Sequence, residues 1–147
     1  MSDDILYEEV GYVRLITINR PLKMNSLDFS ANEDLINAFK QFDSDKSARI
    51  AVLTGSGEAS FCAGADLKNY TMNFATTPSQ EFRETYTNGY GLGGITRNLN
   101  IYKPTIAAIN GYAMSGGFEI ALACDMRLCS PNAIFALQDV KWGFHAC

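Results

Sequence analysis

Apolar and polar side chains follow regular patterns along the chain, and these patterns predict a series of short strands. Across residues 5–19 they alternate on either side of Gly11-Tyr12, which predicts a β-hairpin. Continuous apolar runs at residues 50–54 and 105–109 predict strands buried on both faces. Two shorter apolar runs predict further strands at residues 126–129 and 134–137.

Helical patterns lie between these strands. Ser26 or Asp28 can cap a helix, whose apolar stripe consists of Leu35, Ile36, Ala38, Phe39 and Phe42. A second helix begins near Gly116 or Gly117. Residues 69–94 are polar and end in a glycine-rich run, so we expect part helix and part mobile loop there. Alternating strands and helices are typical of an α/β fold, and 147 residues suffice for one domain.

Two segments, residues 61–68 and 110–119, share a pattern in which small residues stand where a strand gives way to a helix. Small residues allow the backbone to approach a ligand closely, and a helix N-terminus offers unpaired N–H groups with a partial positive charge. Two such turns side by side would form an oxyanion hole, a pair of donors that stabilises a negatively charged oxygen. Each turn taken alone is also an ordinary strand-to-helix connection.

Two acidic residues accompany these turns. Glu119 follows Gly116 by one helical turn, in an otherwise apolar helix where a carboxylate is costly unless it has a function or a partner. Its carboxylate either takes part in catalysis, points to solvent or pairs with Arg127. Asp139 lies twenty residues beyond Glu119, and taken alone it is a surface or capping acid.

The combination resembles the N-terminal part of the enoyl-CoA hydratase/isomerase, or crotonase, family. The resemblance covers nearly the whole chain and rests on three motifs, at residues 20–27, 61–68 and 110–125. It implies an α/β spiral of repeated β-β-α units, truncated before the C-terminal helical region. The single domain over residues 1–147 would then be incomplete at its C-terminus, and the complete protein would form homotrimers or hexamers.

The resemblance also implies roles for individual residues. The N–H groups of Ala65 and Gly116 would form the oxyanion hole, and Glu119 matches the first catalytic glutamate. Asp139 stands where hydratases usually have a second glutamate, and its side chain is one methylene shorter, so its reach to water or substrate would be altered. The coenzyme A site would be lined by Ala63, Gly64, Ala65, Asp66, Leu67, Lys68 and Gly116, with Lys68 and Lys23 near the phosphates.

These roles predict a lyase that adds water to a 2-enoyl-CoA thioester, with coenzyme A as part of the substrate and no tightly bound cofactor. Double-bond isomerisation, another dehydration, hydrolysis, or a catalytically inactive fragment that binds CoA esters are the alternatives. Dinucleotide binding at Gly55-x-Gly57 is a weaker one, because Ser60 replaces the third glycine and no helix clearly follows.

The amino-acid composition disfavours several other classes of protein. With 47% hydrophobic and 19% charged residues, the chain has a globular composition, and a net charge of −4 disfavours nucleic-acid binding. Four cysteines without a C-x-x-C pair and a single histidine disfavour a zinc site, and we expect reduced thiols in the cytoplasm. The apolar segments are too interrupted for a membrane span, and no secretory signal is visible.

Overall fold

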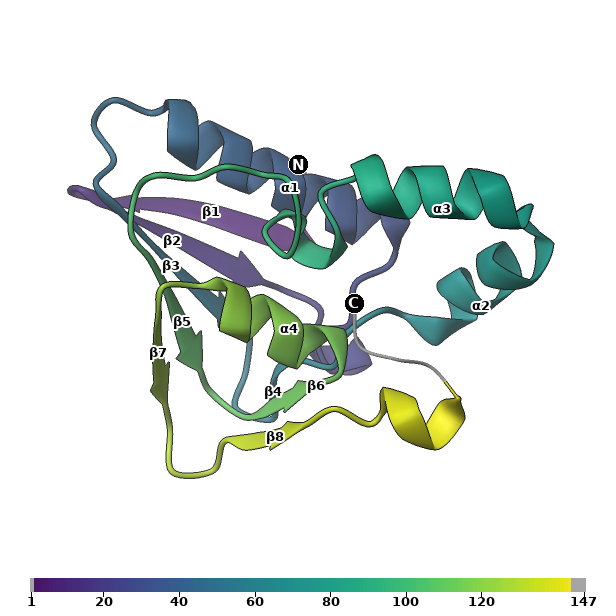
Figure 1. The fold of residues 1–147 in the computed structure, drawn as a ribbon. Helices are drawn as coiled ribbons and strands as arrows, with labels where there is room; N and C mark the ends of the chain where they lie inside the picture. The colour runs from purple at the N-terminus through teal and green to yellow at the C-terminus, as the bar shows by residue number, and fades with distance from the viewer. Residues whose placement is uncertain (1, 144–147) are drawn as a thin grey trace.

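The computed structural model describes residues 2–143, without the side chains of residues 74, 86, 87 and 142. Its larger sheet has the strand order β1-β2-β3-β5-β7 (Figure 1). Strands β1 and β2 form the expected antiparallel hairpin, and each later strand pairs in parallel with the one before it in the sheet. The strands are β1 (Ile5–Val10), β2 (Val13–Ile18), β3 (Ile50–Gly55), β5 (Thr105–Ile109) and β7 (Met126–Cys129).

A second, three-stranded sheet consists of β4 (Ser60–Cys62), β6 (Tyr112–Met114) and β8 (Ile134–Ala136), all parallel. The chain therefore repeats one pattern: β3, β5 and β7 of the large sheet are each followed by a strand of the small sheet and then by a helix. This is the expected spiral of β-β-α units. Strands β4 and β6 correct the sequence interpretation, because β4 overlaps and β6 lies inside a segment that we took for a direct strand-to-helix turn.

Two helices lie where the sequence predicts them. Helix α1 (Phe29–Ser44) is capped by Asp28, not Ser26, since the Asp28 carboxylate accepts a hydrogen bond from the Ala31 N–H at 3.0 Å. Its apolar stripe is buried as predicted. Helix α4 (Gly116–Ala123) buries Gly117, Ile120 and Ala121. Both helices thus fix their orientation by burying one face in the shared core.

Residues 67–94 are more regular than expected. They form α2 (Leu67–Thr76), α3 (Ser79–Asn88) and a short 3₁₀ helix, η2 (Leu92–Gly94). The η2 segment is fixed to α1, because the Gly93 N–H donates to Asn32 Oδ1 at 2.7 Å. It also lies against α4, where a Cβ on Gly93 would be 2.7 Å from Ile120 Cδ1. The glycine-rich run therefore connects α1 and α4; the mobility we expected there stays a prediction.

Burial is uneven across the two sheets. Strands β3 and β5 alternate buried and partly exposed side chains, so they are buried fully on one face only, not on both as predicted. All four side chains of β7 are exposed. No helix in the described part of the chain is long and apolar enough to cross a membrane. Cys62, Cys124 and Cys129 are free thiols, and Cys147 lies outside the described residues.

Candidate active site

The small sheet brings three separate segments to one place. Strands β4, β6 and β8 are parallel neighbours, so their carboxyl ends lie at the same edge. Ala65 follows the first, Gly116 and Glu119 follow the second, and Asp139 follows the third at the start of η3 (Asp139–Trp142). Sequence positions that are more than seventy residues apart thus converge because each occupies an equivalent place in its own turn of the spiral.

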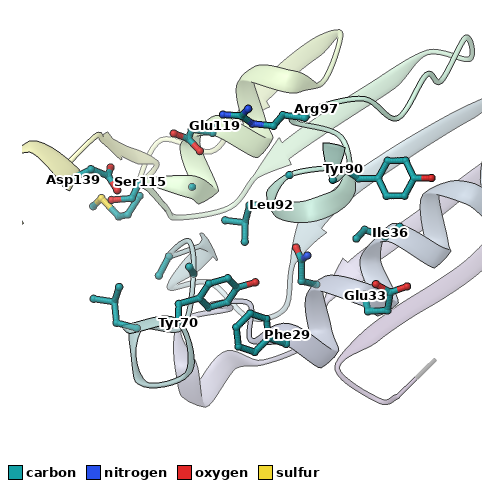
Figure 2. A pocket seen from close by; sticks show the side chains of 18 of the residues that line it. Phe29, Glu33, Ile36, Tyr70, Tyr90, Leu92, Arg97, Ser115, Glu119 and Asp139 are labelled. Carbon is teal, nitrogen blue, oxygen red and sulfur yellow. The ribbon is translucent and has the colours of Figure 1, made fainter. Parts of the chain in front are cut away.

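These residues line a cavity of about 560 Å³ (Figure 2). Figure 2 shows Glu119 and Asp139 on one side of it, with Phe29 and Tyr70 opposite and Leu92 between. The cavity is therefore bounded by acidic groups on one wall and by aromatic rings on the other. Six predicted site residues line it: Ala63, Ala65, Leu67, Gly116, Glu119 and Asp139.

The two glycine turns touch each other at backbone level. Gly64 has a φ of +90°, and a Cβ there would lie 3.1 Å from the Gly116 nitrogen. A Cβ on Gly117 would lie 1.9 Å from the Cys62 carbonyl oxygen, closer than any real contact. Glycine is thus required at both positions for the turns to approach, which is the physical basis of the small-residue pattern.

Ala65 and Gly116 lie beside this junction and line the cavity. The neighbours of Ala65 are held by Leu27, whose N–H donates to Gly64 O at 2.8 Å and whose carbonyl accepts from Asp66 N at 2.8 Å. Within the described part of the chain, neither the Ala65 nor the Gly116 N–H donates to a protein acceptor. Gly116 also opens α4, where helix geometry leaves N–H groups for an external acceptor.

Ser115, just before this donor, has an unusual backbone. Its φ of 48° and ψ of −122° are unfavourable for a residue with a Cβ. The conformation is held by the hydrogen bond from the Ser115 N–H to Ala136 O at 2.8 Å, and by Phe118 and Glu119 N–H groups that donate to Ser115 O. The strained turn directs the chain from β6 into α4 and so places the Gly116 N–H at the pocket.

Glu119 and Asp139 supply carboxylates to the pocket. Glu119 lies half-buried in the first turn of α4. Arg127 is not its partner, because the Arg127 guanidinium donates to carbonyl oxygens at the end of α4, including Cys124 O at 2.6 Å. The Asp139 Oδ2 atom is buried, and it has no hydrogen-bond partner among the described residues. A buried carboxylate oxygen without a protein donor is costly unless water or substrate satisfies it.

The structure places the remaining predicted binding residues elsewhere. Gly64, Asp66, Lys68 and Lys23 do not line the cavity. Lys23 Nζ lies 3.8 Å from Asp28 Oδ2 and 4.0 Å from Asp66 Oδ2, and Asp66 caps α2 by accepting from the Lys68 N–H. Lys68 itself is exposed. A phosphate site at these lysines stays a prediction.

The structure gives less support to a cysteine nucleophile, a metal centre or a dinucleotide site. Burial raises the pKa of the Cys62 thiol to about 12, so this cysteine is not a ready nucleophile although it adjoins the first turn. The described residues contain no group of three His, Cys, Asp or Glu side chains placed to hold a metal ion. Strand β4, not a helix, follows Gly55-x-Gly57, so a dinucleotide turn is absent there.

Sequence reasoning missed the opposite wall of the pocket. The Phe29 and Tyr70 rings stack with centroids 4.3 Å apart, and Arg97 reaches the cavity from the loop after η2. Phe29 opens α1 and Tyr70 lies in α2, within the segments whose placement depends on tertiary packing. No local motif marks any of the three residues.

Comparison with known proteins agrees with this geometry. Residues 8–147 match the sequence profile described as enoyl-CoA hydratase/isomerase. The chain belongs to the enoyl-CoA hydratase/isomerase family. Among solved structures it is similar to an enoyl-CoA hydratase from Mycobacterium marinum, with a TM-score of 0.82 and 34% identity, over 99% of this chain and 53% of that one.

Curated relatives within the family are more similar in sequence. A benzylidenesuccinyl-CoA hydratase from Thauera aromatica is 43% identical over 93% of this chain and 51% of its own length. A carnitinyl-CoA dehydratase from Proteus mirabilis is 42% identical over 97% of this chain and 52% of its own length. The chain thus spans about half the length of the curated relatives it matches.

Proposed function

We propose that this protein adds water to a 2-enoyl-CoA thioester, or removes it in the reverse direction. The observation that carries the proposal is the convergence on one cavity of two backbone donors, Ala65 and Gly116, with two carboxylates, Glu119 and Asp139. The donors suit a developing negative charge on a thioester oxygen. The carboxylates suit the two proton transfers that hydration requires.

In the proposed reaction the thioester oxygen of the substrate lies between the Ala65 and Gly116 N–H groups. One carboxylate removes a proton from water, and the water oxygen forms a bond to the β-carbon. The π electrons move to the thioester oxygen, giving an enolate that the two N–H groups stabilise by about 3–4 kcal/mol per donor. The α-carbon is then protonated by a carboxylic acid as the carbonyl re-forms, so the net change is addition of one water molecule.

Glu119 and Asp139 divide the acid and base roles in this proposal. Hydration needs one group that takes a proton from water and one that gives a proton to the α-carbon, and two carboxylates at one cavity can share these tasks. The unpartnered Asp139 Oδ2 supports a role in holding the water, because no described side chain competes for it. Isomerisation moves a proton between two carbons and requires no such water, so the second carboxylate favours hydration.

The names of the relatives support the same reaction class. Both a hydratase and a dehydratase of CoA esters appear among them, and one reaction is the reverse of the other. Coenzyme A enters the proposal as part of the substrate, and the protein's own donors and carboxylates carry each step. Product analysis after incubation with a 2-enoyl-CoA separates hydration, which gives a 3-hydroxyacyl-CoA, from isomerisation, which gives a 3-enoyl-CoA.

The direct test is Glu119→Gln, which preserves the shape of the side chain and removes its proton chemistry. Turnover of crotonyl-CoA, followed by loss of the enoyl thioester absorbance, should fall by about 10²–10⁴-fold. Binding of butanoyl-CoA, which has no double bond to hydrate, should stay within a few fold. The matched control is Glu33→Gln, since Glu33 also lines the pocket but lies exposed on α1. Equal losses in both variants would argue against a catalytic Glu119.

Assembly and location are part of the same proposal. We expect a homo-oligomer, a trimer or hexamer, in the cytoplasm. The exposed apolar side chains Leu128 and Val140, which are 67% and 73% exposed, support association, and light scattering of the purified protein measures its size. The exposed free thiol of Cys129 is compatible with a reducing compartment.

A further inference from the structure

Arg97 differs from the other charged residues of the pocket. The cavity lining contains three carboxylates, on Glu33, Glu119 and Asp139, and Arg97 is the one cation among the described lining residues. No hydrogen bond or ion pair links its guanidinium to a side chain that the structure describes. Figure 2 shows the Arg97 side chain on the same wall as Glu119, with its guanidinium end toward Glu119. Arg97 is half-buried, and a guanidinium without a partner among the described residues has donors that suit an anion.

The backbone around Arg97 is fixed, so this placement is a property of the fold. The Arg97 N–H donates to Tyr90 O at 3.1 Å, and Asn98 Nδ2 donates to Gly89 O at 2.8 Å, which closes the loop at its base. Thr96 Oγ1 donates to Leu92 O at 3.0 Å. A Cβ on Gly91, at a φ of 72°, would lie 3.2 Å from Arg97 Cγ, so this glycine leaves room for the arginine side chain.

The same loop joins Arg97 to the reaction centre. Leu92 packs directly on the oxyanion-hole residue Gly116, where an added Cβ would lie 2.2 Å from Leu92 Cδ2. Gly93 is held by Asn32 on α1. The loop that carries Arg97 is therefore held against Gly116, and Arg97 lines the same cavity as the proposed thioester site.

We propose that Arg97 is a specificity residue that binds a carboxylate carried by the acyl group, so that the preferred substrate class is a 2-enoyl-CoA with a second, ionised carboxyl group. This inference rests on the proposed function. Arginine pairs with a carboxylate through two parallel hydrogen bonds, a geometry that lysine cannot reproduce. The pair would also offset the repulsion that a substrate carboxylate meets from Glu119 and Asp139.

A cationic acyl group fits the cavity less well. The Arg97 charge would repel it, and the one acid away from the reaction centre, Glu33, is exposed. The Tyr90 ring already has a cation over it, with Lys40 Nζ 4.5 Å from the ring centroid. The Tyr90 ring is thus already occupied by a cation of the protein itself.

The test compares two acyl chains of equal length that differ only in the terminal carboxylate. Calorimetry measures binding of glutaryl-CoA, pentanoyl-CoA and free coenzyme A to the wild-type protein, Arg97→Met and Arg97→Lys. The matched control is Arg83→Met, which removes an exposed arginine of α3 that does not line the pocket. Turnover is measured in parallel with glutaconyl-CoA and 2-pentenoyl-CoA.

We expect wild-type protein to bind glutaryl-CoA more tightly than pentanoyl-CoA, and Arg97→Met to lower that preference by about 10- to 100-fold. Arg97→Lys should be intermediate, and Arg83→Met and free coenzyme A should be unaffected. Absence of a wild-type preference, or an equal loss for all three ligands in Arg97→Met, would overturn the inference; the second result would place Arg97 at a coenzyme A phosphate. A binding preference without turnover of either enoyl ester supports the inference and contradicts the hydration proposal.

Discussion

The two sides of the pocket are held in different ways. On the side of Ala65 and Gly116, the turns after β4 and β6 interlock through Gly64, Gly116 and Gly117, over a core that includes the fully buried Phe61 and Ile120. On the Asp139 side, β7 and β8 leave large side chains in solvent, among them Leu128 at 67% exposed and Ile134 at 48%. Close packing fixes the backbone of the first side. The second side is held mainly by the pairing of parallel strands. The candidate site thus combines a closely packed backbone side with a less constrained carboxylate side.

The largest expected effect is on the interlocked side. Gly117→Ala places a methyl group 1.9 Å from Cys62 O, so β4 or α4 must move. We expect unfolding by urea to show a loss of about 3 kcal/mol, at the upper end for overpacking, and binding of acyl-CoA to weaken with it.

The control for this variant is Gly11→Ala in the hairpin turn. Gly11 has a positive φ of 59° but no atom within 4 Å of an added Cβ. Its cost should be about 1 kcal/mol, from the backbone conformation alone. If the two variants lost equal stability, the contact between the turns would not be the constraint we describe.

Asp139→Asn should separate activity from stability. The Asp139 Oδ2 atom has no hydrogen-bond partner among the described residues, so the free energy of unfolding should change by less than about 0.5 kcal/mol. Hydration of crotonyl-CoA should fall by about 100-fold, because the variant cannot exchange a proton with water. Unchanged turnover would remove Asp139 from the mechanism and return it to the role of a surface acid.

A smaller effect on stability is expected from substitution of Asp125, which follows α4. Asp125 Oδ2 accepts from the Thr105 N–H at 2.8 Å and from its hydroxyl at 2.9 Å, which ties the segment after α4 to β5. These hydrogen bonds lower the pKa of Asp125. The folded state therefore holds fewer protons than the unfolded state as pH falls below the ordinary value of 3.8, and stability is present above that pH and is lost below it.

Asp125→Asn tests this linkage. At neutral pH we expect a loss of about 1 kcal/mol, since the residue is exposed and its charge is screened. Between pH 5 and pH 3 the wild-type free energy of unfolding, from urea titrations, should fall more steeply than that of the variant. Parallel curves for the two proteins would show that Asp125 does not contribute to acid sensitivity.

The smallest effect is expected on the exposed side. Leu128→Ala in β7 should change stability by less than about 0.5 kcal/mol. The same substitution in β3, at Leu53, which is 1% exposed, should cost about 3 kcal/mol. Both residues belong to the large sheet, so chemical denaturation of the pair measures how unevenly the sheet is stabilised. Comparable losses would indicate that β7 is covered in solution.

Much of the fold was predictable, because the signals were local. The hairpin, a cap of α1 at Ser26 or Asp28, the strands at residues 50–54 and 105–109, and the start of α4 all followed from alternation, capping and small-residue patterns. Strands β4 and β6 were not predictable in this way. Each has three residues, too few to show a period, and each forms only because a neighbouring turn of the spiral presents its edge.

The residues of the candidate site also fall into a group that the sequence predicts and a group that it does not. Ala65, Gly116 and Glu119 lie in or directly after glycine turns that the sequence marks, and the structure brings them to one cavity. Phe29, Tyr70 and Arg97 escaped detection because α1, α2 and the loop at residues 89–98 meet only after tertiary packing. Site residues that lie in a local backbone turn can be predicted from the sequence. Site residues that are brought together only by the packing of distant elements cannot.

The small parallel sheet has a consequence for how such a site can change. Each of its strands ends in a different chemical function: one donor after β4, a donor and an acid after β6, a second acid after β8. Because each strand contributes its own residue, the segment after β8 can be exchanged without disturbing the Ala65 donor, which lies two strands away. The length of the acidic side chain at position 139 can therefore change without moving the donor after β4. A protein with this fold can acquire a new reaction through substitutions in a single β-β-α unit.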